Sequence, residues 1–219
     1  MVVRRAEIRA PHDARFREAI SKEDVRGRDR AYKLAMVDPA LALTTARAIV
    51  SPWYRTQALS YVIRHGSVDM AVSALNLARQ AAASETDAYR QVAVMAWPIK
   101  AALETKKSSV AKQMLNDALA KAPTIEHLGS RAQALSMLYF ATTSGSAPEL
   151  GRLVLALLPE LCPPDRHWRA ARFYCNVAIA MAETDISAAR DFVATMPAGP
   201  TQAKAQRLIG RLETALTKP

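Results

Sequence analysis

A recurring phrase constrains the fold of this chain more than any other feature of its sequence. The phrase reads YRTQALSYV at 54–62, YRQVAVMAW at 89–97 and SRAQALSML at 130–138. In each copy an Arg is followed three residues later by Ala and then by an apolar residue, and Arg55, Arg90 and Arg131 are 35 and 41 residues apart. Self-similarity at such a period is typical of repeat proteins.

A second phrase alternates with the first. It reads ALTTARAI at 42–49, ALNLARQA at 74–81 and, more loosely, MLNDALAKA at 114–122. Apolar or small residues recur at i, i+3, i+4 and i+7, as in Ala58, Leu59 and Val62, which is the period of a buried helix face. Two alternating helical phrases predict a repeat made of two helices.

Looser copies continue the pattern to the end of the chain. First-helix copies are ELGRLVLALLPEL (149–161) and DISAARDFVATM (185–196), and second-helix copies are HWRAARFYCNVAIAMA (167–182) and QAKAQRLIGRLETAL (202–216). In the fourth copy we align Trp168 with Arg131. The sequence therefore predicts an all-α fold, a right-handed α-solenoid of about five antiparallel helix pairs in which neighbouring repeats complete one another's core.

We expect residues 38–219 to form these repeats and residues 1–37 to form a basic N-terminal segment with capping helices at 13–20 and 21–36, all in one continuous domain. Helix starts are expected at the capping residues Asp38, Ser67, Ser108, Ser146 and Thr184. Helices should stop near Gly66, Gly145 and Gly199. Pro98 lies inside an apolar run and should kink or end its helix.

The phrase PWYRTQAL (52–59) resembles the HEAT-type repeat, whose second helix begins with an Arg and alanines. The phrase ALNLARQA (74–81) is similar to tetratricopeptide-type repeats, in which an Ala allows two helices to cross closely. No repeat fits the full consensus of either kind. The resemblance implies a curved scaffold that binds protein or nucleic acid, which is an analogy of fold and does not identify a site.

Charge and composition narrow the class of partner. The chain of 219 residues has 30 Lys and Arg against 20 Asp and Glu, a formal charge of +10, which favours anionic partners. No apolar run suits a signal peptide or a transmembrane segment, so a cytoplasmic protein is expected. Cys162 and Cys175 are too few for a disulfide scaffold and are expected to pack as small apolar residues.

Catalytic and metal-binding patterns are missing from the sequence. It has no GxxxxGK[ST], GxGxxG, GxSxG or HExxH motif, so we predict no catalytic residue, no metal site and no cofactor. Four histidines, at positions 12, 65, 127 and 167, fall in or beside predicted turns and are never spaced as i, i+3 or i+4. Eight carboxylates gather at predicted helix beginnings, where capping explains them, namely Asp38, Asp69, Glu85, Asp87, Glu126, Glu149, Asp165 and Asp185.

The repeated arginines Arg55, Arg90 and Arg131 have two interpretations. In a regular solenoid they would form a row of cations about 10 Å apart that reads phosphates or acidic side chains. Alternatively, each guanidinium binds carbonyls or an acidic residue of the preceding repeat and its stem lies on the core. A repeated position is first of all a structural one, which favours the second interpretation.

Other candidate binding residues are aromatic or basic. Trp53 and Trp168 precede second helices, close to Arg55 and Arg169, and their rings can either stack on bases or pack into the next turn. Lys106 and Lys107 belong to a basic cluster in the turn between the second and third helix pairs.

The leading functional hypothesis is a non-enzymatic binding scaffold that holds a protein segment, acidic in character, on its concave face. The alternative is a nucleic-acid-binding solenoid, in which positive charge would concentrate on the concave face. A third hypothesis follows from resemblance alone: HEAT-like alkylpurine DNA glycosylases are similar in length, charge and helix pairing, but none of their motifs is present. The sequence leaves the oligomeric state open.

Overall fold

The computed structural model describes residues 21–216, and every regular element in that range is a helix. The α-helices are α1 (Lys22–Ala35), α2 (Pro39–Ala48), α3 (Pro52–His65), α4 (Val68–Ala83), α5 (Ala88–Val94), α6 (Ala96–Glu104), α7 (Ser108–Lys121), α8 (Leu128–Ser144), α9 (Pro148–Leu161), α10 (Trp168–Ala182), α11 (Ile186–Ala194) and α12 (Pro200–Leu216). Two short 3₁₀ helices, η2 (Ala122–Thr124) and η3 (Pro164–Arg166), precede α8 and α10. The prediction of an all-α fold is confirmed.

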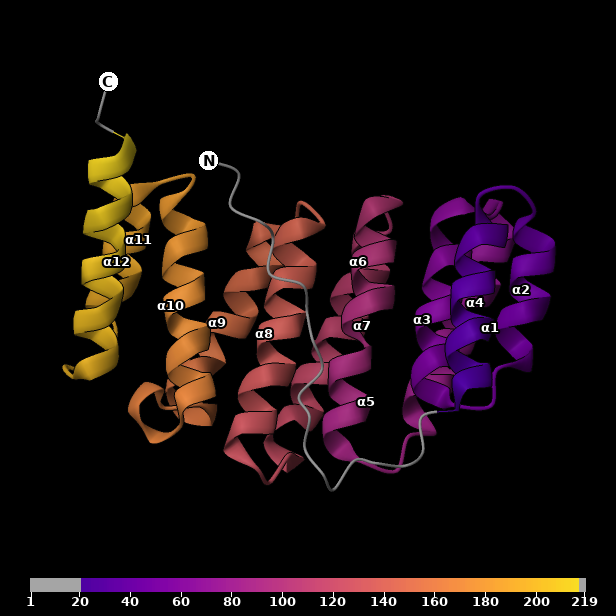
Figure 1. Ribbon diagram of the computed structural model, residues 1–219, viewed down its shortest axis with the longest axis horizontal. Coiled ribbons are helices and arrows are strands. Elements are labelled where there is room, and N and C mark those ends of the chain that lie inside the picture. The colour runs from indigo at the N-terminus through magenta and orange to yellow at the C-terminus, as the bar shows by residue number, and fades with distance from the viewer. Residues whose placement is uncertain (1–20, 217–219) are drawn as a thin grey trace.

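The helices form two layers and follow one another along the long axis of the molecule (Figure 1). In the first layer α1 packs on α3, α3 on α6, α6 on α8, α8 on α10 and α10 on α12, while α5 and α6 are two parts of one bent helix. We call these helices the major layer. Helices α2, α4, α7, α9 and α11 lie against them, contact one another more sparsely, and are called the minor layer.

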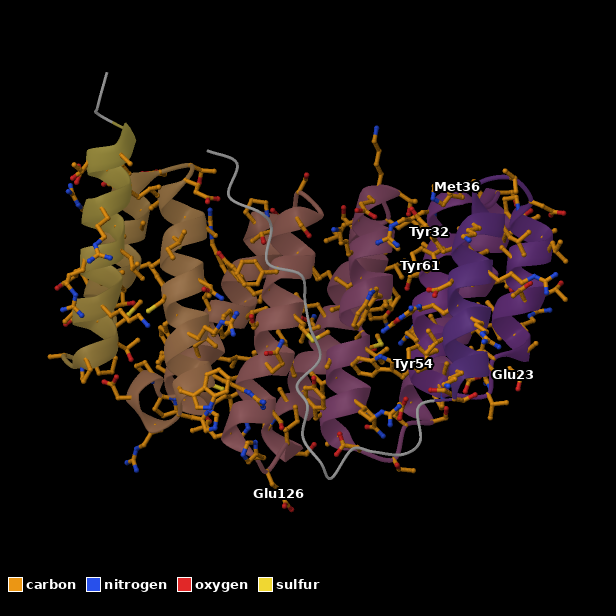
Figure 2. The ribbon with its side chains drawn as sticks, in the orientation of Figure 1. Glu23, Tyr32, Met36, Tyr54, Tyr61 and Glu126 are labelled. Atoms are coloured by element: carbon orange, nitrogen blue, oxygen red, sulfur yellow. The ribbon has the colours of Figure 1, made fainter. Side chains whose placement is uncertain are left out.

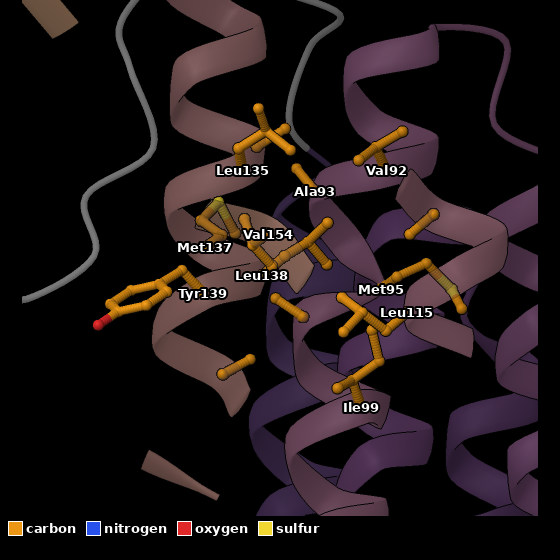
Figure 3. Packing of buried hydrophobic residues seen from close by; sticks show 14 of the residues in the cluster. Val92, Ala93, Met95, Ile99, Leu115, Leu135, Met137, Leu138, Tyr139 and Val154 are labelled. Atoms are coloured by element: carbon orange, nitrogen blue, oxygen red, sulfur yellow. The ribbon is translucent and has the colours of Figure 1, made fainter. Parts of the chain in front are cut away.

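Alanine lets the two layers approach closely. Ala58 on α3 and Ala134 on α8 are fully buried, and large apolar residues such as Leu59, Leu135 and Leu138 fill the space beside them. Figure 3 shows Leu135 and Leu138 of α8 among side chains of the neighbouring helices, including Val92, Ile99, Leu115 and Val154. One apolar cluster therefore runs through the molecule, because each helix buries its face against its neighbours and not against its own chain alone.

Helix starts agree with the sequence at two of the five predicted caps. The side chains of Asp38 and Ser67 accept hydrogen bonds from the backbone N–H groups of Leu41 and Met70. The other three predictions are wrong. Lys107 and Ala147 are the cap residues of α7 and α9 and make no side-chain cap bond, so Ser108 is already helical and Ser146 lies in the turn before. Asp185, one residue beyond Thr184, caps α11.

Helix interruptions follow proline and glycine. The bend at Met95 separates α5 from α6, one turn before Pro98, because the proline ring has no N–H for the carbonyl of Val94 and crowds it. Gly66 and Gly145 are the C-terminal cap residues of α3 and α8, as expected. Gly199 does not end a helix but precedes α12, since α11 already ends at Ala194.

The segment 21–36 forms the predicted second-type helix, α1, whereas the predicted helix at 13–20 lies outside the described residues. Helix α1 packs against both α2 and α3. The carboxylate of Asp24 on α1 accepts hydrogen bonds from the N–H groups of Val50 and Ser51, 2.9 and 3.2 Å away, at the start of α3.

Among the helices of residues 21–216, none combines the length and the apolar character that a membrane crossing requires.

Candidate functional site

The repeated arginines bind the protein's own backbone or a neighbouring carboxylate. Arg55 donates from Nε to the carbonyl of Ile49 at 2.7 Å, and Arg131 donates from Nε to the carbonyl of Ile125 at 2.9 Å. Nη1 of Arg131 also reaches the carbonyl of Leu161, 3.1 Å away at the end of α9. These contacts favour the interpretation that the two arginines have a structural role, because each guanidinium links a second-type helix by hydrogen bonds to the connection before it.

Arg90 occupies a related place but has a different partner. Its Nε lies 3.0 Å from Oε2 of Glu85, a buried carboxylate in the connection before α5. The guanidinium also lies over the ring of Trp53, 5.7 Å from the ring centroid. Arg90 thus connects the indole of α3 to the beginning of α5.

The fourth copy of the repeat has no arginine at this position. Arg131 is the fourth residue of α8, whereas Trp168 is the first residue of α10, and Ala171 is its fourth. Aligning Trp168 with Arg131 is therefore wrong. The buried pattern gives the same register, because Leu135 and Leu138 of α8 correspond to Cys175 and Ala178 of α10.

Trp53 packs against the core with other aromatic residues. Its ring lies 5.4 Å from that of Trp97 in an edge-to-face arrangement and 6.4 Å from that of Tyr89. Burial raises the pKa of Tyr89 to about 12, and the charge of Arg169 opposes that rise.

Trp168, by contrast, is 61% exposed. The guanidinium of Arg169 lies 5.1 Å from its ring centroid, and the ring of His167 stacks on it at 5.8 Å with an interplanar angle of 27°. His167 in turn meets His127 edge to face at 5.4 Å. We call His127, His167, Trp168 and Arg169 the Trp168 cluster. In this cluster the indole of Trp168 is exposed to solvent while His167 and Arg169 contact its ring.

The two histidines reach this position because each caps a helix. Nδ1 of His127 accepts the N–H of Ser130 at 3.2 Å, and Nδ1 of His167 accepts the N–H of Arg169 at 3.1 Å. Gly129 at the start of α8 leaves room for the His167 ring, with which a Cβ would collide. Burial, His127 and Arg169 together lower the pKa of His167. The sequence could not pair these histidines, since they are 40 residues apart.

A second aromatic cluster, not predicted from the sequence, lies on α1 and α3. The rings of Tyr32 and Tyr61 are 4.8 Å apart, and Tyr32 is 46% exposed. The guanidinium of Arg64 lies 5.9 Å from the centroid of Tyr61, and that of Arg28 lies 5.4 Å from the centroid of Tyr54. We call these five residues the Tyr32 cluster. Figure 2 shows Tyr32, Tyr61 and Tyr54 following one another along α1 and α3.

The spacing of this cluster was a usable signal. Tyr54 and Tyr61 are seven residues apart on α3, and Arg28 and Tyr32 are four apart on α1, so each pair lies on one helix face. The contact between Tyr32 and Tyr61 could not be predicted from this spacing, because it depends on the packing of α1 on α3.

Lys106 and Lys107 lie apart from both clusters. They follow the C-terminal end of α6, whereas Trp53, Arg90 and Trp168 lie at the N-terminal ends of their helices. Lys106 is exposed and has a left-handed backbone, with φ of 59°, and Lys107 caps α7. The two lysines and the tryptophans therefore do not form one common surface.

Within residues 21–216, no group of three or more His, Cys, Asp and Glu side chains is placed to hold a metal ion. Cys162 and Cys175 are both buried, and burial raises the pKa of the Cys162 thiol to about 11. These thiols are thus protonated, apolar packing groups at neutral pH.

Positive charge is concentrated in the major layer. Its helices contain fifteen basic residues, namely Lys22, Arg26, Arg28, Arg30, Lys33, Arg55, Arg64, Arg90, Lys100, Arg131, Arg169, Arg172, Lys204, Arg207 and Arg211, against five acidic ones, Glu23, Asp24, Asp29, Glu104 and Glu213. Those of the minor layer contain six, namely Arg47, Arg79, Lys112, Lys121, Arg152 and Arg190, against Asp69, Asp117, Glu149, Glu160 and Asp191. The helices of the major layer thus carry nearly all of the net helical charge.

Comparisons of the chain with protein families, with curated proteins and with solved structures gave no match.

Proposed function

We propose that this chain is a non-enzymatic binding scaffold, a right-handed α-solenoid of five helix pairs preceded by α1, and that its major layer binds nucleic acid. The concave side of a two-layer array is the one whose helices are closer together. The denser contacts between successive helices of the major layer support its assignment to that side.

One observation carries the proposal. The helices of the major layer contain fifteen basic and five acidic residues, whereas those of the minor layer contain six basic and five acidic residues. A general excess of charge that served only solubility would have no reason to favour one layer. An excess of positive charge in one layer is what a surface that binds a phosphate backbone requires.

The aromatic residues favour nucleic acid as the ligand. From the sequence alone, an acidic protein segment was the leading hypothesis. Both exposed aromatic side chains among residues 21–215, Tyr32 and Trp168, belong to the major layer. Trp168 lies beside Arg169, and Tyr32 lies beside Tyr61, whose ring is in contact with Arg64. Aromatic rings interleaved with cations suit a ligand that has both bases and phosphates. An acidic peptide would bind the cations but would not need the rings, so it is the alternative ligand in the test.

The test compares two variants that lose the same charge from opposite layers. Arg172, Lys204 and Arg207 are exposed on α10 and α12 of the major layer, and all three are changed to Gln. The matched control changes the exposed Arg47, Lys112 and Arg152 of the minor layer to Gln. Fluorescent DNA and RNA oligonucleotides are titrated between about 50 and 200 mM salt, where each lost phosphate contact lowers the log–log slope by about 0.7 to 0.9.

We expect the major-layer variant to bind nucleic acid at least about tenfold more weakly, with a reduced salt slope, and the minor-layer variant to bind like the wild type. Equal weakening by both variants would mean that only net charge matters and would contradict the proposal. Tighter binding of a fluorescent poly-Glu peptide than of any oligonucleotide, lost in the major-layer variant alone, would replace nucleic acid by an acidic protein segment.

A further inference from the structure

We infer that the major layer is specific for single strands, because Tyr32 and Trp168 act as two separate platforms on which unpaired bases stack. This inference rests on the proposed function and adds to it the class of nucleic acid that is bound. It is carried by the two clusters of rings and arginines at opposite parts of the layer.

Each of the two exposed rings is in contact with a second ring, although the two clusters come from unrelated stretches of sequence. Trp168 stacks on His167 and has the guanidinium of Arg169 5.1 Å from its centroid. Tyr32 lies 4.8 Å from Tyr61, which has the guanidinium of Arg64 5.9 Å from its centroid. In each case a second ring holds the exposed one in place, so little side-chain entropy is lost when a base stacks on it.

The remaining rings of the layer are buried or partly buried. Trp53 and Trp97 are packed against the core, and Tyr89, Tyr139 and Phe173 are buried. An exposed indole or phenol is therefore not the general state of aromatic residues in this molecule. The exposed rings of Tyr32 and Trp168 are therefore the two that a ligand with flat, apolar faces can reach.

Only unpaired bases can use such platforms. In a duplex each base is stacked between its neighbours, and its faces are not available to a protein ring, whereas single strands expose them. Beside Trp168, Arg169 and the exposed Arg172 one turn further along α10 are placed to contact the phosphates on either side of a stacked base. The same cations would attract a duplex, but without stacking. In the Tyr32 cluster, Arg28 and Arg64 form ion pairs with Asp29 and Glu104, so Tyr32 contributes stacking without a free cation.

The distance between the platforms predicts a length dependence. Helices α1 and α10 are four packing steps apart in the major layer, through α3, α6 and α8, which is about 30 to 40 Å at the usual interhelix spacing. At a rise of about 3.4 Å per nucleotide a strand of roughly ten nucleotides spans that distance. A strand of four nucleotides can occupy one platform, and a strand of twenty can occupy both.

The experiment measures binding of a twenty-nucleotide dT strand, a four-nucleotide dT strand and a twenty-base-pair duplex at about 100 mM salt. The variants are Trp168→Ala and Tyr32→Ala, with Trp168→Phe as the change that keeps a ring. Val68→Ala removes a side chain that is 71% exposed on α4 of the minor layer and is the matched control. Thermal unfolding is recorded for each variant, and because both rings are exposed, all variants should fold.

We expect each Ala variant to bind the long strand about 5- to 150-fold more weakly, the range of one lost base stack, while duplex binding changes less than about twofold. Trp168→Phe and Val68→Ala should keep most of the affinity. The long strand should also quench the tryptophan emission of the wild type, and that quenching should disappear in Trp168→Phe, because Trp53 and Trp97 are packed against the core.

Two results would overturn the inference and can be told apart. If strands and duplex bind equally, with no effect of the Ala variants and no quenching, the chain binds nucleic acid through its charge alone, and stacking is wrong. If no nucleic acid binds at about 50 mM salt, the proposed function itself fails, and the inference fails with it.

Discussion

At the scale of single residues, two histidines cap the N-termini of helices, a role that usually belongs to Ser, Thr, Asp or Asn. Nδ1 of His127 and of His167 accepts a backbone N–H in the first turn of α8 and α10. A nitrogen that accepts a hydrogen bond has no proton of its own, so the capping form of each ring is neutral. Protonation removes the cap and adds a positive charge at the positive end of a helix dipole.

The first prediction concerns His167 and pH. Its pKa in the folded chain is lowered by burial, by His127 and by Arg169, while in the unfolded chain it is near 6.5. As the pH falls below about 6.5 the unfolded chain takes up the proton more readily, so this contribution to stability is present at neutral pH and is lost on acidification. The melting temperature should fall between about pH 7 and pH 5.

His167→Asn is the matched variant, because Asn can cap α10 but does not titrate. Its melting temperature should depend less on pH over the same range than that of the wild type. Identical pH profiles for the two proteins would mean that His167 does not couple stability to pH.

At the scale of elements, helix α1 belongs to the packed array. It packs on α2 and α3, and Asp24, which is 8% exposed, accepts hydrogen bonds from Val50 and Ser51 at the start of α3. A carboxylate on one second-type helix thus binds the N–H groups that precede the next one. Asp165 has the same role further along, accepting from Thr201 in α12 at 3.1 Å.

The second prediction tests this link between α1 and α3. Asp24→Ala leaves two backbone N–H groups without their acceptor and should lower the free energy of unfolding by about 2 to 3 kcal/mol, measured by urea denaturation. Asp24→Asn keeps one acceptor oxygen and should have an intermediate effect.

Asp29→Ala is the control on the same helix. Asp29 is an exposed partner of Arg28 at 2.7 Å, and such surface ion pairs contribute less than about 1 kcal/mol. Faster amide exchange at Val50 and Ser51 in Asp24→Ala alone would locate the effect. Equal destabilisation by Asp24→Ala and Asp29→Ala would contradict the link.

At the scale of the whole molecule, stability is distributed unevenly along the chain. Central helices such as α6 and α8 have neighbours on both sides, whereas α1 and α12 have a neighbour on one side within the described part of the chain. A pocket of about 270 Å³ also lies between α11 and α12, lined by residues that include Val193, Ile209 and Gly210. The last helix pair therefore borders a hollow, and its helix α12 has a neighbour in the major layer on one side alone.

The third prediction follows from that arrangement. Hydrogen exchange should be slowest in α5 to α8, with lower opening free energies in α11 and α12 and intermediate values in α1 and α2. Native-state exchange followed by mass spectrometry measures this directly. One common opening free energy for all helices would mean that the array unfolds as a single cooperative unit.

The sequence by itself determined the helices and several of their boundaries. The 3.6-residue period, the Asp38 cap and the break before Pro98 depend on residues within about one helical turn of one another, and such local interactions can be read directly from the order of residues. Where it failed, the helix begins one residue later than expected: Asp185 caps α11 in place of Thr184, and α9 follows Ala147, which makes no side-chain cap bond, in place of Ser146.

Only the tertiary structure decided which of these residues lie together. It placed His127 beside His167 and Tyr32 beside Tyr61, bound the guanidinium groups of Arg55 and Arg131 to backbone carbonyls, and left Trp168 exposed while Trp53 was packed. It also separated a basic layer from a nearly neutral one. The physical reason is that helix formation depends on contacts a few residues apart, whereas the composition of a surface depends on how helices tens of residues apart pack to bury their apolar faces.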